Sequence, residues 1–195
     1  MKVIGITGGI GSGKSFVCEI LEEMGFSVYY SDESAKNLMN SDFRIQKELK
    51  LLIGDEAYTE DGLNRELISN KIFSDTTLRQ KINQLIHPIV REDFEQWKKG
   101  FTDDEFIFNE AAILFETGAY LNYDSVILVY APIELKLERI KKRDGISEEE
   151  VLTKMKSQWS DEQKMKLTPH HILNDGKNPL RERISVILKQ LSTPI

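Results

Sequence analysis

Residues 8–15 read GGIGSGKS and constrain the fold of this chain more than any other segment. They match the spacing G-x-x-x-x-G-K-[ST], in which glycines let the backbone curl until successive N–H groups point inward at an anion. The β-branched run Val3–Thr7 precedes them, and an amphipathic helical pattern follows. A helix that begins near Lys14 would add the positive end of its dipole, so the segment predicts a phosphate-binding loop.

The loop also predicts the chemistry of its ligand. The Lys14 ammonium can bridge the β- and γ-phosphates of a nucleoside triphosphate, and the Ser15 hydroxyl can bind Mg²⁺. An ordinary glycine-rich turn at a helix start is the alternative, and it does not account for a match to an eight-residue motif between a predicted strand and a predicted helix. The residues expected here to contact the nucleotide are Gly8, Gly9, Gly11, Ser12, Gly13, Lys14, Ser15 and Phe16.

Five short apolar or β-branched runs alternate with helical patterns along the chain. They are Val3–Thr7, Ser27–Tyr30, Phe106–Asn109, Ser125–Tyr130 and His171–Asn174. A strand, a helix and a second strand at this spacing predict parallel strands with right-handed crossovers. Residues 32–100 differ, because they show several helical patterns and a polar break at residues 59–62 but no strand. We therefore expect an α/β fold with a parallel sheet and a helical insertion.

Two further patterns concern local structure. Ser147 and Glu150 have capping-box spacing, and they precede an apolar helical stripe that ends at Trp159. The pair His87-Pro88 is expected at a helix junction, since proline breaks the helical hydrogen-bond ladder. Cys18 is expected to be a small core residue, because no basic partner is apparent for it.

The composition limits the partners. The 195 residues are 40% hydrophobic and carry a net charge of −6, so a packed core is expected and coating of nucleic acid is not. No apolar run approaches the roughly 20 residues that cross a bilayer, and no signal peptide is apparent. The single cysteine is consistent with a reducing compartment. We expect a cytoplasmic protein, monomeric or weakly homo-oligomeric, without nucleic-acid or membrane partners.

Two acidic residues follow predicted strands, where ligands of open parallel sheets bind. Asp32 comes just after the second strand, where it could face the γ-phosphate and accept a proton from a substrate hydroxyl, or cap the helix that follows. Glu110 ends the third strand, where it could hold Mg²⁺ through water or remain a solvated acid.

Basic residues could contact phosphates outside the loop. Arg139 and Arg143 lie four residues apart, so they share a helix face that could serve as a lid over a transferring phosphoryl group. The alternative is a solvated helix face, since Lys136, Lys141 and other neighbours are charged too. Arg65 and His87, in the insertion, have either a substrate-binding or a structural role.

The chain resembles the dephospho-coenzyme A kinase family, a family of P-loop kinases, over nearly its whole length. The segments that carry the resemblance are Ile6–Ser15, Ser31-Asp32, Asp61–Arg65, Leu85–Val90, Ile113–Glu116, Arg139–Asp144, Gln158 and Asn174–Gly176. The resemblance implies a five-stranded sheet with the strand order 2-3-1-4-5. It also implies transfer of the γ-phosphate of ATP to the ribose 3′-hydroxyl of dephospho-coenzyme A, with Mg²⁺.

The resemblance further implies roles for individual residues. They are Asp32 as the base, Arg139 and Arg143 in the lid, Lys36, Arg65 and His87 toward the substrate, Ser15 and Glu110 toward Mg²⁺, and Asn174 near the adenine. The sequence departs from the family pattern at several positions. Tyr30 and Ser31 replace Asp and Ala, Lys36 replaces Arg, and Glu110 and Ala112 replace Asp and Pro.

We expect a nucleotide-binding core at residues 1–31, 101–138 and 151–195, a coenzyme A-binding insertion at 32–100, and a lid at 139–150. Two other functions stay open on the residues alone. One is a kinase for a different small molecule or nucleotide, and the other is a regulatory nucleotide switch with slow hydrolysis.

Overall fold

The computed structural model describes residues 1–193, without the side chains of residues 73 and 74. The chain divides into two compact units. The sheet unit contains Met1–Tyr30 and Phe101–Ile195, and the helical unit contains Ser31–Gly100. Each unit is described by itself below.

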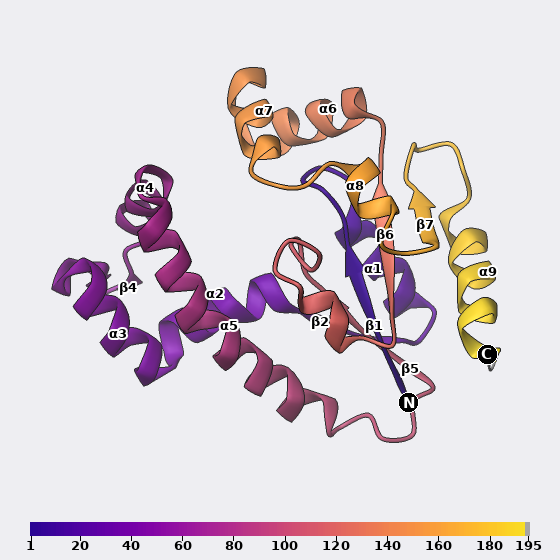
Figure 1. The fold of residues 1–195 in the computed structure, drawn as a ribbon, viewed down its shortest axis with the longest axis horizontal. Coiled ribbons are helices and arrows are strands. Elements are labelled where there is room, and N and C mark those ends of the chain that lie inside the picture. Colours follow the sequence, from indigo (N-terminus) through magenta and orange to yellow (C-terminus); the bar gives the residue numbers. More distant parts are fainter. Residues whose placement is uncertain (194–195) are drawn as a thin grey trace. The chain divides into compact units, whose positions relative to one another are not determined.

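Five parallel strands form the centre of the sheet unit (Figure 1). They are β1 (Lys2–Thr7), β2 (Ser27–Tyr30), β5 (Phe106–Glu110), β6 (Ser125–Tyr130) and β7 (His170–Leu173). Their order is β2-β5-β1-β6-β7, and every neighbouring pair is parallel. The predicted α/β class and the strand order are confirmed, and the last strand begins one residue earlier than expected.

Both faces of the sheet are covered, which gives three layers. Helices α1 (Lys14–Glu23) and α9 (Leu180–Ser192) pack on one face, against a core that includes Ile127 and Val129 of β6. The alternate β6 residues, Val126 and Leu128, pack on the other face against residues 111–123. Strands that are buried on both faces read as continuous apolar runs, and this explains the missing alternation in the sequence.

Three further helices of the sheet unit follow β6. They are α6 (Ile133–Asp144), α7 (Glu148–Lys156) and α8 (Asp161–Met165), with the short helix η2 (Ala119–Asn122) before β6. The Ser147 capping box of α7 is confirmed. The expected position of Trp159 on the helical stripe is wrong, because α7 ends at Lys156 and a second capping box at Ser160 starts α8. Trp159 is 43% exposed.

The helical unit consists of four α-helices and a small hairpin. Its elements are α2 (Ser31–Ser41), α3 (Phe43–Ile53), η1 (Asp55–Ala57), β3 (Tyr58–Thr59), β4 (Gly62–Leu63), α4 (Arg65–Ser74) and α5 (Thr76–Lys98). The expectation that this segment has no strand is wrong: the polar break is the turn of an antiparallel hairpin. Its strands have two residues each, too few to show any alternation.

The expected helix junction at His87-Pro88 is also wrong. Helix α5 continues through Pro88, which costs one hydrogen bond to the carbonyl four residues earlier, at Gln84. The apolar face of α5, with Ile82, Ile86 and Ile89, is buried, and this packing stabilises the helix across the proline. Within residues 1–193, no helix has both the length and the apolar content to span a membrane.

Candidate active site

The phosphate loop follows β1 and curls tightly into α1. Gly13 has a φ of 86° and immediately precedes the helix. A Cβ atom at Gly13 would lie 2.0 Å from Nδ2 of Asn174, and one at Gly8 would lie 2.1 Å from the carbonyl oxygen of Val129. Both positions therefore require glycine, because neighbouring groups leave no room for a side chain. Gly13 requires it also because of its positive φ.

Helix α1 begins without a capping side chain. Helices α3, α5 and α7 begin with Asp42, Asp75 and Ser147, whose side chains accept hydrogen bonds from the first-turn amides. Gly13 provides no such acceptor, and the first turn of α1 contains no acidic residue. The amides and the positive dipole end at this terminus are arranged for an external anion.

Lys14 and Glu110 lie together at the loop. The Lys14 ammonium donates a hydrogen bond to the Gly8 carbonyl at 3.2 Å and lies 3.6 Å from Oε1 of Glu110. Glu110 ends β5 and is only 7% exposed. The alternative of a solvated strand-end acid is therefore wrong for Glu110.

A hydroxyl and a carboxylate are available for a magnesium ion. Ser15 is exposed on the first turn of α1, and Glu110 supplies hard oxygen atoms. The described residues contain no group of three His, Cys, Asp or Glu that could hold a metal. Mg²⁺ commonly binds one or two protein oxygens and completes its octahedron with phosphate oxygens and water, so this donor set fits Mg²⁺.

Arg139 and Arg143 have different surroundings, although they share a helix. Arg139 donates hydrogen bonds to the carbonyls of Gly11 (3.3 Å), Ser12 (3.4 Å) and Asn174 (3.1 Å), so it supports the loop backbone. Arg143 is exposed and pairs with its neighbour Asp144 at 2.6 Å. The solvated-face alternative fits Arg143 and is wrong for Arg139.

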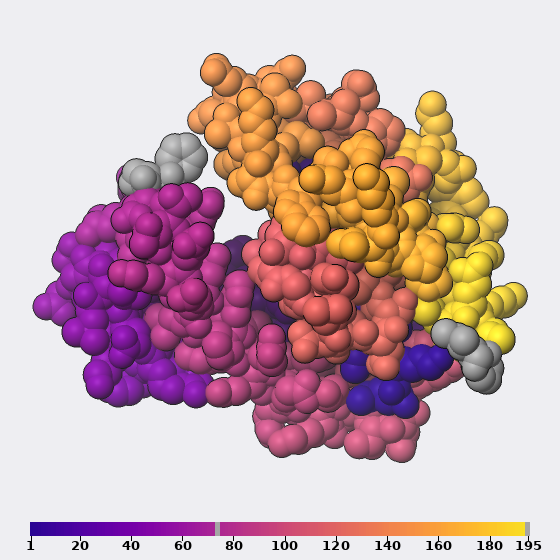
Figure 2. All heavy atoms as spheres, viewed as in Figure 1, coloured from indigo at the N-terminus to yellow at the C-terminus, as the bar shows by residue number. Residues whose placement is uncertain are grey.

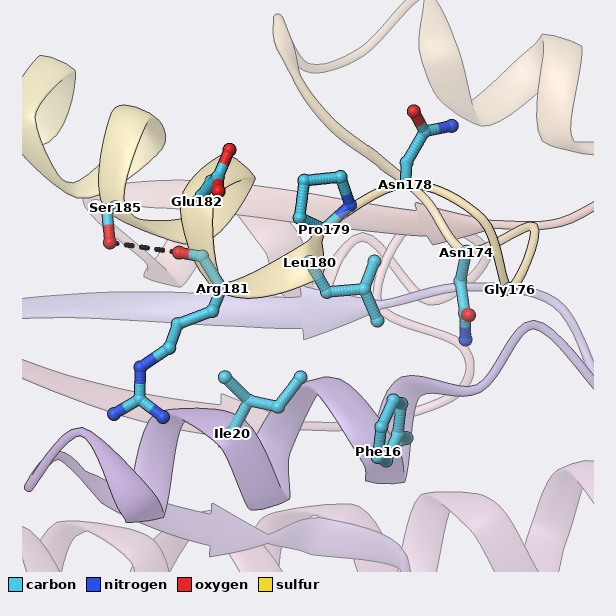
Figure 3. Close-up of a pocket in the computed structure, with 10 residues that line it drawn as sticks. All are labelled: Phe16, Ile20, Asn174, Gly176, Asn178, Pro179, Leu180, Arg181, Glu182 and Ser185. Carbon is cyan, nitrogen blue, oxygen red and sulfur yellow. Dashed lines mark hydrogen bonds between the residues drawn. The ribbon is translucent and has the colours of Figure 1, made fainter.

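Asn174 joins the loop to the segment after β7. It is 4% exposed, and its Nδ2 donates to the Ser12 carbonyl at 3.0 Å. It also lines an open pocket of about 580 Å³ together with Phe16, Ile20 and Leu180. In Figure 3, Phe16 and Ile20 rise from α1 toward Leu180, with Asn174 on the neighbouring segment. An apolar wall beside a phosphate loop can accommodate the flat base of a nucleotide.

Three polar side chains for which no role was predicted from the sequence support the outer side of the loop. Oε1 of Gln158 accepts a hydrogen bond from the Ile10 amide at 2.9 Å, and Lys136 pairs with Asp161. The expectation that Lys136 is on a solvated face is wrong, since it is 6% exposed. The available signal was its position four residues before the buried Ile140, on the apolar stripe of α6.

Cys18 and Tyr30 are neutral residues of the sheet unit. Cys18 is fully buried in the core, as expected, and burial raises the pKa of its thiol well above the usual value. The Tyr30 hydroxyl donates to Glu22 on α1 at 3.0 Å, and burial raises its pKa as well. Tyr30 therefore ties the end of β2 to α1 as a hydrogen-bond donor.

The remaining candidates belong to the helical unit. Asp32 and Lys36 are exposed on α2, and Arg65 is the exposed first residue of α4. The capping alternative for Asp32 is wrong. A capping residue precedes its helix, whereas α2 begins at Ser31 and already contains Asp32. His87 on α5 interacts electrostatically with Asp32; partial burial, followed by repulsion from Arg91, lowers the pKa of the imidazole despite the opposing effect of Asp32.

The three-layer fold and the phosphate loop define a P-loop nucleotide-binding protein. A family model described as dephospho-CoA kinase matches residues 2–179. The chain is 43% identical over 181 residues to a dephospho-CoA kinase of Bacteroides fragilis, covering 93% of this chain and 88% of the relative. The chain belongs to the dephospho-CoA kinase family.

Solved structures agree with this assignment. A Thermus thermophilus protein has a TM-score of 0.88 and 31% identity, covering 99% of this chain and 98% of its own. The dephospho-CoA kinase from Campylobacter jejuni has a TM-score of 0.69 and 26% identity, covering 97% and 96% of the two chains. The similarity extends over both units, because it covers almost the complete chain.

Proposed function

We propose that this protein transfers the γ-phosphate of ATP to the ribose 3′-hydroxyl of dephospho-coenzyme A and releases coenzyme A and ADP. The observation that carries the proposal is the uncapped start of α1 behind a glycine loop, in a chain of this family. The loop supplies backbone donors and a cation for a polyphosphate, and the family match over residues 2–179 supports the acceptor.

The sheet unit would bind ATP. Loop amides other than that of Ile10, which donates to Gln158, surround the β- and γ-phosphates, and the Lys14 ammonium stabilises the charge that moves toward the bridging oxygen. The adenine packs against Phe16 beside Asn174, in the open pocket. Ser15 and Glu110 would hold Mg²⁺, and a bound ion would supply charge neutralisation at the phosphate oxygens.

The helical unit, residues 32–100, would bind dephospho-coenzyme A. We assign the base to Asp32: its carboxylate accepts the proton of the 3′-hydroxyl as that oxygen bonds to the γ-phosphorus and the bond to the β-phosphate oxygen breaks. Lys36, Arg65 and His87 are proposed to contact the anionic acceptor, with Lys36 as a point charge. Residues 139–150, with Arg143 exposed, are proposed as a lid that excludes water.

The working form of the protein is proposed to be a cytoplasmic monomer or weak homo-oligomer with no nucleic-acid partner. A net charge of −6 opposes binding to nucleic acid, and a single buried cysteine suits a reducing compartment.

Acceptor-dependent ADP release tests the assignment. The purified protein is given MgATP with dephospho-coenzyme A, with other nucleosides and small alcohols, or with water alone. We expect dephospho-coenzyme A to stimulate ADP release far above the rate with water, and the product to carry its new phosphate on the ribose 3′-oxygen. Stimulation by a different acceptor would identify another kinase, and slow hydrolysis without acceptor dependence would indicate a nucleotide switch.

A further inference from the structure

Residues 157–166, which include α8, support the phosphate loop from outside. Gln158 makes the direct contact, because its Oε1 accepts a hydrogen bond from the Ile10 amide at 2.9 Å. An amide that donates to Gln158 is directed away from the phosphates. This hydrogen bond therefore fixes the orientation of the Gly9–Ile10 peptide at the start of the loop.

A buried ion pair anchors this segment next to Gln158. Oε1 of Glu116 accepts a hydrogen bond from the Trp159 amide at 3.0 Å and lies 2.8 Å from the Lys164 ammonium. Lys164 is completely buried. In Figure 2, the orange atoms of this segment lie directly against the salmon atoms of residues 111–123. Removing either partner would leave a buried charge uncompensated, so the contact is strongly maintained.

A second ion pair touches the loop one residue before Ile10. Lys136 of α6 is 6% exposed and pairs with Asp161 of α8. A Cβ atom placed on Gly9 would lie 3.4 Å from both Nζ of Lys136 and Oδ1 of Asp161. The pair therefore forms a wall against Gly9 and restricts outward movement of the peptide that Gln158 holds.

We propose that Gln158 is a positioning residue for phosphoryl transfer. It orients the Gly9–Ile10 peptide before ATP arrives, so that the amides that follow it already aim at the phosphates. The ion pairs Glu116–Lys164 and Lys136–Asp161 keep Gln158 in place. Preorganised donors need no reorganisation on binding or in the transition state. We therefore expect the Gln158 contact to raise both nucleotide affinity and kcat. The proposal rests on the proposed function only in that a nucleotide binds at this loop.

The variant Gln158→Ala tests this role, with Gln163→Ala as the matched control. Gln163 also accepts an amide hydrogen bond within the segment, from Ser160 at 2.9 Å, and its variant removes a helix cap rather than the contact with the loop. We expect Gln158→Ala to weaken ADP binding about tenfold in titration calorimetry, as loss of a partner for a partly buried donor does. We also expect a lower kcat and faster hydrogen exchange at the Ile10 amide by NMR. Gln163→Ala should leave both ADP affinity and Ile10 exchange at the wild-type values.

Two further variants separate positioning from folding. Gln158→Glu keeps an acceptor of the same length and should restore protection of the Ile10 amide. Gln158→Met keeps the length without the acceptor and should reproduce the effects of Gln158→Ala. It takes the place of the alanine variant if that protein is too unstable to purify. Wild-type ADP affinity and Ile10 exchange in both acceptor-free variants would overturn the proposal, as would equal losses in Gln163→Ala. Binding of ADP does not involve the acceptor, so failure of dephospho-coenzyme A as a substrate leaves this result interpretable.

Discussion

The sheet unit and the helical unit hold their candidate residues in different ways. In the sheet unit, backbone amides, buried glycines and short contacts to Asn174 and Arg139 fix the phosphate loop. In the helical unit, Asp32 and Lys36 are exposed on the first two turns of α2, and Arg65 is exposed at the start of α4. The comparison teaches that the phosphate loop is prepared in advance by packing, whereas the residues proposed to bind the acceptor are exposed side chains that packing does not fix.

The largest expected effect is at the prepared site. Lys14→Ala should lower kcat between about a hundredfold and about a thousandfold, because it removes a preorganised charge from the loop. Steady-state ADP release measures the loss. Lys189→Ala, an exposed lysine of α9, is the matched control and should retain normal turnover. Near-normal turnover in Lys14→Ala would show that its ammonium does not contact the phosphates.

The next effect concerns the helical unit. Asp32→Asn should lower kcat about a hundredfold and change the calorimetric affinity for ADP little, since a general base acts on the acceptor. Glu33→Gln is the control, because Glu33 is the other acidic residue in the first turn of α2 and contributes the same dipole stabilisation. Equal losses in the two variants would mean that the charge at the helix start matters and the base does not.

A smaller effect distinguishes the two arginines of α6. Arg139→Ala should lower the free energy of unfolding by about 2 kcal/mol, because several carbonyls lose a charged donor. Arg143→Ala should change it by less than about 0.5 kcal/mol, because its ion pair is exposed. Denaturant unfolding measures both values. A destabilised Arg143 variant beside an unaffected Arg139 variant would contradict the structural distinction.

The smallest effect is a pH dependence that both units share. The pKa values of His87 in the helical unit and His170 in the sheet unit are lowered from 6.5, first of all by burial. Each imidazole takes up a proton more readily in the unfolded chain, so its contribution to stability is complete above pH 6.5 and declines as the pH falls through and below that value. We expect Tm to fall by about 1–3 °C from this source between about pH 7.5 and about pH 5.5.

Variants resolve the contribution of each histidine. His87→Gln and His170→Gln should each reduce the slope of Tm against pH over this range, as measured by calorimetry. A steeper slope of Tm against pH in either variant would mean that protonation of that histidine stabilises the folded protein, which contradicts a lowered pKa.

The sequence predicted the features that depend on local patterns. The loop, the five strands and the cap at Ser147 all have signals within a few residues. Features that depend on distant partners were missed. Lys136 and Lys164 were not expected to be buried, because Asp161 and Glu116 reach them only in the folded chain. The helix break expected at Pro88 was wrong for the same reason. The lost hydrogen bond is visible in the local sequence, whereas the tertiary packing of α5 that outweighs it is not.

The bare start of α1 has a consequence for the stability of the protein in a cell. A bound triphosphate would serve as the missing cap, so the ligand contributes to folding as well as to chemistry. A nucleotide at a hundred times its dissociation constant adds about 2.7 kcal/mol to the free energy of unfolding. A nucleotide bound at this loop, ATP or ADP, would therefore slow proteolysis of the folded chain, because cleavage needs an opening that the ligand opposes.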